Sequence, residues 1–311
     1  MSKLAFIFPG QASQHVGMGY DLYCNYEIAR EMYDRASRIL NYDIAKISFE
    51  GPMEQLTQTR VTQPAILIHS LIITDILKNL KIQPHMVAGH SLGEYSALAC
   101  AEAFSFENAL ELVKIRAEEM QRAGEENPGT MAAIIGLDPE KVEEVCIEVQ
   151  DIGVATIANY NCPGQIAISG SVDAVRKAME ISKEKGARRA IQLEVSGAFH
   201  SPLMSTARQT LTEALNGVEI KSPKYPIYTN VTADPTTDPE EIRLLLIRQL
   251  ESPVLWTQSI QNMIKDGAHT FLEVGPGKVL QGLVRRTDKS IHAAGIEKIE
   301  DIESFLETNT V

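Results

Sequence analysis

The pentapeptide Gly89-His90-Ser91-Leu92-Gly93 constrains the fold of this chain more than any other segment. It has the form G-x-S-x-G, and it stands between the apolar run 86–88 and the helix-forming stretch 94–103. This order predicts a strand, a sharp turn and a helix, with the Oγ of Ser91 exposed at the turn and facing the helix N-terminus. Ser91 is therefore a candidate nucleophile. The simpler alternative is a tight strand-to-helix turn with a small residue at its tip.

The rest of the chain fits a layered α/β arrangement around this turn. We expect a strand at 4–8, two helices within 20–40, a helix opened by Pro64 and running to Leu80, and a helix at 106–123 capped by Ser105. After residue 196, strands are expected at 227–230, 270–274 and 291–294, with helices between them. Strands alternating with helices are typical of an α/β domain with a parallel sheet.

A different pattern fills the middle of the chain, after Asn127-Pro128-Gly129. The predicted elements are a strand at 131–137, a helix at 140–150, strands at 154–158 and 165–169, a helix at 172–185 and a strand at 190–195. The order βαββαβ is that of a ferredoxin-like unit. We therefore predict a large α/β subdomain from residues 1–128 and 197–311, and a small ferredoxin-like subdomain inserted as residues 129–196.

Composition excludes several classes of protein. The formal net charge of −12 argues against a nucleic-acid binder. The four cysteines are scattered without metal-like spacing, which favours a reduced, cytoplasmic chain without a metal site. The longest apolar region, 65–80, is interrupted by His69, Asp75 and Lys78, so we interpret it as a buried helix and expect no membrane span.

A nucleophilic serine needs a base, and His200 is the best placed of the seven histidines. It lies in the small-residue loop 196–202, between a predicted strand and a predicted helix, where catalytic residues of α/β folds gather. His90 adjoins Ser91, but neighbouring side chains diverge. His69 lies in an apolar helix and is better explained as a core residue.

Arg116 falls within the apolar stripe of its predicted helix, which Ala109, Val113 and Met120 form. A buried guanidinium needs an anionic partner. That partner is either an internal carboxylate, in a structural salt bridge, or the carboxylate of a substrate bound bidentately.

The turn Phe8-Pro9-Gly10-Gln11 also ends a strand, and its N–H groups are candidates to face the same end of the sheet as Ser91.

Eight segments together resemble one enzyme family along essentially the whole chain. They are FPGQ, TQP at 62–64, GHSLGEYSAL, KIRAEEMQ, ANYNCPGQI, GAFHSPLM, RQLESPVLW and LEVGPGKVL, in this order. This set resembles the malonyl-CoA:acyl carrier protein transacylases of fatty acid synthesis, a family that includes the acyltransferase domains of polyketide synthases. The resemblance implies a hydrolase-like α/β core with an inserted ferredoxin-like subdomain.

The resemblance also implies a role for each matching residue. Ser91 would carry malonate as an ester, and His200 would be its base, oriented by the main-chain carbonyl of Gln249. The N–H groups of Gln11 and Leu92 would form the oxyanion hole. Arg116 would bind the free malonyl carboxylate, and Gln63 and Asn161 would line the pocket. Phe199 resembles the malonyl-selecting form of the family.

The expected reaction is ping-pong transfer of malonyl from malonyl-CoA to the phosphopantetheine thiol of an acyl carrier protein, by a monomer without metal or other cofactor. A local basic surface is expected to receive the acidic carrier protein, with Lys185, Arg188, Arg189, Lys278, Arg285 and Arg286 as candidates. The alternatives are a trans-acting acyltransferase of a polyketide synthase, an acyl-hydrolase on the same scaffold, and a non-catalytic subunit that docks carrier proteins.

Overall fold

The main sheet of the protein has six strands and is buried on both faces. In the computed structural model, which describes residues 3–309, its order is β10-β9-β1-β2-β7-β8. All neighbours are parallel except the edge pair β7 and β8. The strands are β1 (Lys3–Phe8), β2 (Met86–Gly89), β7 (Ile227–Tyr228), β8 (Pro235–Thr236), β9 (Ala268–Val274) and β10 (His292–Ile296).

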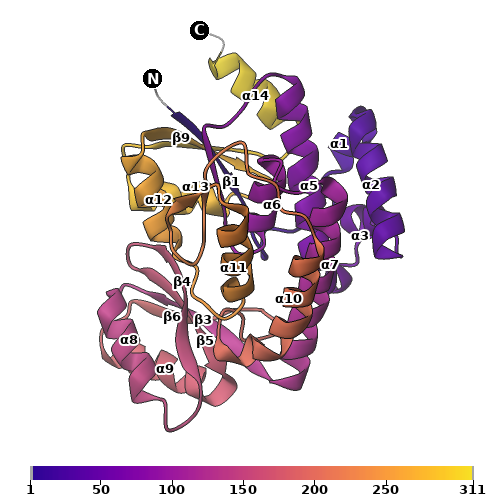
Figure 1. The fold of residues 1–311 in the computed structure, drawn as a ribbon. Coiled ribbons are helices and arrows are strands. Elements are labelled where there is room, and N and C mark those ends of the chain that lie inside the picture. Colours follow the sequence, from indigo (N-terminus) through magenta and orange to yellow (C-terminus); the bar gives the residue numbers. More distant parts are fainter. Residues whose placement is uncertain (1–2, 310–311) are drawn as a thin grey trace.

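Alternate side chains of β1 pack into two different hydrophobic clusters, one on each face of the sheet. Phe6 and Phe8 belong to the large cluster that α5 and α7 also fill, whereas Ala5 and Ile7 belong to a second cluster with residues of α12 and α13. Successive side chains of a strand point to opposite faces, so helices must cover both. Figure 1 shows the two helical layers on either side of the sheet.

Thirteen helical segments accompany this sheet in the described part of the chain. They are α1 (Tyr20–Asn25), α2 (Glu27–Leu40), α3 (Ile44–Glu50), α4 (Met53–Leu56), α5 (Thr59–Asn79), α6 (Gly93–Cys100), α7 (Phe106–Glu126), the 3₁₀ helix η1 (Pro202–Ala207), α10 (Arg208–Gly217), α11 (Pro239–Gln249), α12 (Trp256–Lys265), α13 (Val279–Thr287) and α14 (Ile299–Asn309). The predicted cap of α7 is confirmed, because the Ser105 side chain accepts from the N–H of Asn108 at 3.1 Å.

The predicted start of α5 was wrong. The helix begins at Thr59, five residues before Pro64, so the proline lies inside it. A proline within a helix leaves the carbonyl four residues earlier without its usual donor. Here that carbonyl belongs to Arg60, and the hydroxyl of Tyr42 donates to it at 3.1 Å. A tertiary contact thus replaces the missing helical hydrogen bond, and no local sequence signal reports it.

Helix α5 is long and apolar enough to cross a bilayer by length and composition alone, but the prediction that this region is a buried helix is confirmed. In the structure, 89% of its most apolar 18-residue window is buried inside the protein. It packs between the main sheet and α7, with residues such as Ile66, Ile72 and Leu77 in the large cluster. This helix is the central core helix of the fold.

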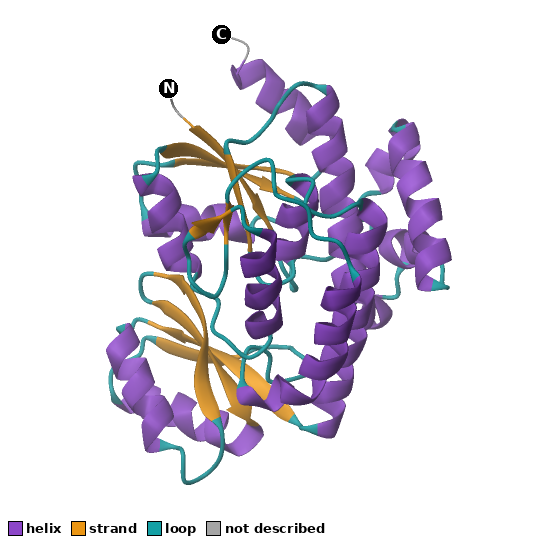
Figure 2. Ribbon diagram, in the orientation of Figure 1, coloured by secondary structure: helices purple, strands orange, loops and turns teal. Residues whose placement is uncertain are grey.

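A second, antiparallel sheet is built from the middle of the chain. Its strands are β3 (Gly129–Ile135), β4 (Ala155–Cys162), β5 (Gln165–Ser171) and β6 (Arg189–Gln192), in the order β4-β5-β3-β6. Helices α8 (Pro139–Glu148) and α9 (Val172–Glu184) enclose a separate hydrophobic cluster against it. Figure 2 shows both helices on the side of this sheet away from the core. The α/β class with a βαββαβ unit is confirmed, while the subdomain boundaries at 128/129 and 196/197 stay a prediction.

The small sheet is joined to the core through strand β4. The N–H of Val254 donates to the carbonyl of Ala158 at 2.8 Å, and the N–H of Tyr160 donates to the carbonyl of Val254 at 2.9 Å. These two bonds place the end of β4, and Asn161 with it, against the segment that follows α11. Residues far apart in sequence therefore converge beside the turn that carries Ser91.

Candidate active site

The turn between β2 and α6 has the geometry that the G-x-S-x-G pattern predicts. Ser91 stands at its tip with φ of 54°, in the left-handed region. A Cβ on Gly89 would lie 1.9 Å from the carbonyl of Gly93, and a Cβ on Gly93 would lie 2.1 Å from the carbonyl oxygen of Phe8. The two glycines therefore permit β1, β2 and α6 to pass at a distance that no side chain would allow.

His200 lies against the candidate nucleophile. Its Nε2 is 2.7 Å from the Oγ of Ser91. Its Nδ1 lies 2.9 Å from the main-chain carbonyl of Gln249 and 3.2 Å from that of Ser252. Carbonyl oxygens only accept, so Nδ1 carries the proton and Nε2 presents its lone pair to the serine hydroxyl. Burial, reinforced by the nearby Arg116, lowers the pKa of His200 to about 3, which keeps the ring in the neutral form that a base requires.

Arg116 is fully buried next to the same hydroxyl. Its Nη2 donates to the Oγ of Ser91 at 3.0 Å and to Oε1 of Gln249 at 2.9 Å. Its Nη1 donates to Oε1 of Gln63 at 2.7 Å. Within residues 3–309 no carboxylate lies within ion-pair distance of this guanidinium, and its Nε is buried without a hydrogen-bond partner. The internal salt bridge that the sequence left open is therefore not formed, and one buried N–H of the guanidinium, whose Cζ lies 5.5 Å from the centroid of the Tyr95 ring, has no partner among these residues.

Two buried residues of the site escaped the sequence analysis. Asn230, just after β7, accepts from the N–H of Ser91 at 2.7 Å and donates to the carbonyl of Gly89 at 2.7 Å. Glu94, in the first turn of α6, accepts from the N–H of Asn230 at 3.0 Å and from the side-chain amide of Gln249 at 2.8 Å. An acidic residue inside the apolar helix 93–100 was the available signal for Glu94, whereas the position of Asn230 depends on which strand pairs with β2.

The other predicted residues occupy different parts of the surroundings. Gln11 is half-buried, with its side chain 3.3 Å from the hydroxyl of Thr59, in the loop that follows β1. Leu92 caps α6, so its N–H is at the helix N-terminus beside Ser91. The Oδ1 of Asn161 lies 2.9 Å from Nε2 of His90. His90 therefore holds Asn161 by a hydrogen bond and does not act as the base. Phe199 is buried in the large core cluster.

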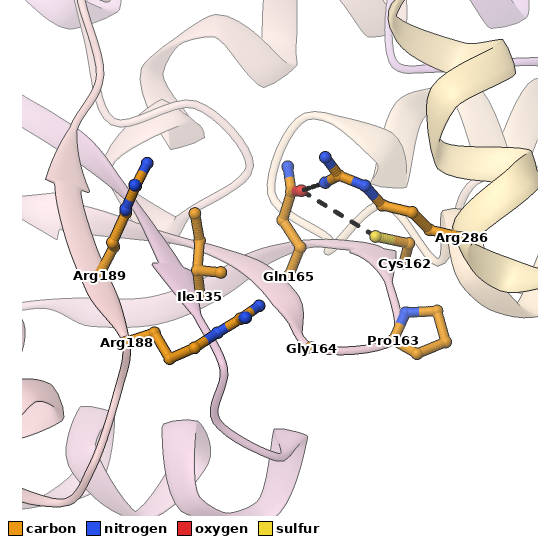
Figure 3. A pocket seen from close by; sticks show the side chains of 8 residues that line it. All are labelled: Ile135, Cys162, Pro163, Gly164, Gln165, Arg188, Arg189 and Arg286. Atoms are coloured by element: carbon orange, nitrogen blue, oxygen red, sulfur yellow. Dashed lines mark hydrogen bonds between the residues drawn. The ribbon is translucent and has the colours of Figure 1, made fainter.

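A basic pocket of about 440 Å³ lies where the small sheet meets α13. Arg188 and Arg189 approach it from the start of β6, and Arg286 approaches from α13 on the opposite side (Figure 3). Arg286 donates to Oε1 of Gln165 at 2.6 Å. The other three candidate cations do not line this pocket. Lys185 is paired with Glu148 at 2.9 Å, Arg285 donates to Gln281 and Ala293, and Lys278 lies elsewhere on the surface.

Comparison with known proteins shows the family of this chain. Residues 5–305 match the acyl transferase domain family. The chain belongs to the acyl transferase family. It is 45% identical over 309 residues to the malonyl CoA-acyl carrier protein transacylase of Bacillus subtilis, covering 99% of this chain and 98% of the relative. It is 42% identical to the enzyme of the same name from Haemophilus influenzae, covering 98% and 100%.

Solved structures of acyl transferases superpose on the whole fold. An acyl carrier protein S-malonyltransferase from Vibrio cholerae gives a TM-score of 0.94 at 41% identity, covering 98% of this chain and 100% of that one. A malonyl-transacylase in complex with a type II PKS acyl-carrier protein, in the holo form, gives 0.96 at 39% identity, covering 99% and 100%. The predicted family and acyltransferase fold are confirmed.

Proposed function

We infer that the chain transfers a malonyl group from malonyl-CoA to the phosphopantetheine thiol of an acyl carrier protein, through a malonyl ester of Ser91, and thereby supplies extender units for fatty acid synthesis. The relatives from Bacillus subtilis and Haemophilus influenzae carry the name of this transfer. The observation in this chain that carries the proposal is the guanidinium of Arg116, buried beside the Oγ of Ser91 with its Nε unused.

Acylation begins at the pair formed by Ser91 and His200. The neutral ring takes the hydroxyl proton at Nε2 while Oγ attacks the thioester carbonyl. The imidazolium then returns this proton to the sulfur of CoA as the carbon–sulfur bond breaks. The carbonyls of Gln249 and Ser252 hold the Nδ1 proton through both steps, so the ring keeps its orientation without an acidic third member. The carrier-protein thiol reverses the sequence in the second half-reaction.

The oxyanion of the tetrahedral intermediate is assigned to the backbone N–H groups of Gln11 and Leu92. Leu92 opens α6, where unpaired N–H groups and the helix dipole favour negative charge. Gln11 follows β1, whose Phe8 carbonyl accepts from the N–H of His90 at 3.0 Å, so its loop lies against the serine turn. Each such donor is worth roughly 3 kcal/mol of transition-state stabilisation.

Arg116 selects acyl groups that carry a free carboxylate. Its Nε has no other acceptor, and Gln63 and Gln249 hold the two Nη atoms. A malonyl carboxylate would receive charge-assisted hydrogen bonds, which are about twice as strong as neutral ones. An acetyl group would leave the buried N–H unpaired. Asn161 and Phe199 are proposed to line the acyl pocket, with Phe199 restricting its size.

The basic pocket formed by Arg188, Arg189 and Arg286 is the proposed contact for anionic groups of the two thiol carriers. CoA and phosphopantetheine both bear phosphates, and carrier proteins are acidic, whereas this chain has a net charge of −12. A local cluster of exposed arginines offsets that repulsion at one place. The complex between a related transacylase and a carrier protein supports such a partner.

We also propose that the protein acts as a monomer in the cytoplasm, without a metal.

The deciding experiment compares transfer with hydrolysis. The purified protein is incubated with malonyl-CoA, with and without a phosphopantetheinylated carrier protein, and both malonyl carrier protein and free malonate are measured. We expect one malonyl group per enzyme in the first case and rapid transfer in the second. Free malonate formed faster than malonyl carrier protein would identify the chain as an acyl-hydrolase instead.

A further inference from the structure

The buried carboxylate of Glu94 has no part in the mechanism given above, yet it is connected to both ends of the site. It is 1% exposed and lies three residues after the nucleophile. Its Oε2 accepts from the side-chain amide of Gln249 at 2.8 Å and from the N–H of Asn230 at 3.0 Å. A buried ionised carboxylate needs such partners and a nearby positive charge.

The side chain of Gln249 connects this carboxylate to Arg116. The amide Nε2 donates to Glu94 and the amide Oε1 accepts from Nη2 of Arg116 at 2.9 Å. An amide group can present either its oxygen or its NH₂ to a neighbour. The ionised carboxylate of Glu94 and the main-chain carbonyl of Ser91, at 3.0 Å, both accept from the amide nitrogen, and together they fix the orientation in which the oxygen faces the guanidinium. Glu94 therefore helps to position Arg116, the residue proposed to bind the malonyl carboxylate, through one intervening side chain.

We propose that Glu94 is the resident counter-ion of the acyl pocket and a positioning residue for malonyl selection: it balances the charge of Arg116 across the Gln249 amide in the empty enzyme and takes up a proton when the malonyl carboxylate binds Arg116. This inference rests on the proposed function. In the empty site the guanidinium has a neutral His200 nearby, and the Glu94 carboxylate acts on it from the other side of the Gln249 amide. Malonyl loading adds a second carboxylate to the same buried guanidinium, and two neighbouring carboxylates in a low-dielectric site do not both stay ionised.

The groups that surround Glu94 allow it to take up a proton when the malonyl carboxylate binds. The titratable groups that act on it are Arg116 from α7 and, next to it on α6, Tyr95, which remains protonated because burial raises its pKa to about 12. Helix α11 and the loop after β7 contribute the amides of Gln249 and Asn230. Burial raises the pKa of Glu94 to about 7, against these hydrogen bonds and Arg116, which lower it. The carboxylate is thus close to protonation before any substrate arrives.

Transfer of the acyl group from CoA to Ser91 neither takes up nor releases a proton. Proton uptake by Glu94 can therefore be measured without a background from the reaction itself. The Ser91 hydroxyl loses its proton to the departing CoA sulfur, and one ester replaces one thioester. Any partial ionisation of the released thiol is the same for malonyl-CoA and acetyl-CoA. The difference in proton uptake between the two substrates, per mole of acyl-enzyme formed, therefore reports on the pocket.

The experiment loads the full chain with malonyl-CoA or acetyl-CoA in weak buffer containing a pH indicator, at pH 6, 7 and 8, and counts acyl-enzyme by intact mass. We expect the malonyl-minus-acetyl uptake to rise from a small fraction of a proton at pH 6 towards one at pH 8, where Glu94 is ionised in the empty enzyme. In Glu94→Gln this difference should disappear. Glu273→Gln is the matched control, since Glu273 is also buried with a pKa raised to about 7 but bonds to Leu280 and Gln281 of α13.

Each result decides the matter. Equal uptake for the two substrates in the wild type, or a difference that survives in Glu94→Gln, overturns the role of Glu94 and leaves the transferase intact. If the wild type forms no malonyl-enzyme, the proposed function fails and this inference fails with it. Should Glu94→Gln not fold, the pH series in the wild type still decides, because a difference that does not grow from pH 6 to pH 8 contradicts the exchange.

Discussion

The main-chain carbonyl of Gln249 accepts the Nδ1 proton of His200 at 2.9 Å. The side chain of the same glutamine accepts from Arg116, so one residue orients the base with its backbone and the carboxylate clamp with its amide. Substitution of the Gln249 side chain removes the contact with Arg116, and with it the amide bonds to Glu94 and to the carbonyl of Ser91, but leaves the main-chain contact with His200. The base and the clamp are therefore separable by mutation, although a single residue supports both.

Ser91→Ala should abolish covalent loading, because the hydroxyl that His200 activates is gone and the turn itself accepts a small side chain. Intact mass after incubation with malonyl-CoA should show one added malonyl group in the wild type and none in the variant. Retention of the label by Ser91→Ala would move the nucleophile to another residue.

His200→Ala should slow acylation by roughly 10²–10⁴-fold, the usual contribution of a general base. The pH profile gives a second check. Because the pKa of His200 is lowered to about 3, the base stays neutral well below pH 6.5, and acylation by the wild type should not fall between pH 7 and pH 5 as it would with an ordinary histidine. A rate that halves near pH 6.5 would contradict the burial of this ring.

Arg116→Ala should change selectivity as well as rate. Loss of a charge-assisted contact of about 1.5–3 kcal/mol corresponds to a fall of about 10–150-fold in malonyl transfer, whereas acetyl transfer loses no such contact. The ratio of kcat/KM for the two substrates is the measurement. Arg122→Ala, which removes an exposed arginine paired with Glu119 on the same helix, is the control. Equal losses for both acyl groups would make Arg116 a structural residue.

Reversing the charge of Arg188 and Arg189 together, to glutamate, should raise KM for the carrier protein and weaken its dependence on salt. Exposed charges attract over a Debye length of about 10 Å at 0.1 M ionic strength, so the effect should be largest at low salt. The control is Lys185→Glu, because Lys185 already faces Glu148 and does not line the pocket. An unchanged KM for carrier protein in the double variant would exclude this pocket as the docking contact.

Glu273→Gln should become progressively less stable than the wild type as the pH falls from 7 to 4.5. The pKa of Glu273 is about 7 in the folded protein and 4.5 in the unfolded chain. A raised carboxyl pKa means that the folded state binds more protons in this window, so its contribution to stability is present below 4.5 and lost as the pH rises to 7. The glutamine in Glu273→Gln does not titrate, so the variant lacks the stabilisation that the wild type gains on protonation. The difference in unfolding free energy should grow by about 1.4 kcal/mol per pH unit, measured by denaturant titration, and a constant difference would refute it.

The sequence predicted those parts of the site that depend on local pattern. The strand, turn and helix around Ser91 follow from glycine spacing, and the burial of Arg116 follows from its place in the apolar stripe. Gln249 and Asn161 were found only through the family resemblance. Asn230 and Glu94 were missed, since their roles arise from the pairing of β7 with β2, a contact between residues about 140 positions apart in the chain. The start of α5 was missed for the same reason, because Tyr42 provides the donor that Pro64 lacks.

The close crossing at Gly89 and Gly93 has a genetic consequence. Any side chain at either position would enter the space of a backbone 1.9–2.1 Å away, whereas the serine between them can lose its hydroxyl without moving a neighbour. A screen for inactive alleles in this pentapeptide should therefore recover two kinds. Changes at the glycines should yield little soluble protein. Changes at Ser91 should yield normal amounts of an inert enzyme that still binds its carrier, and overproduction of that form should interfere with a functional copy in the same cell.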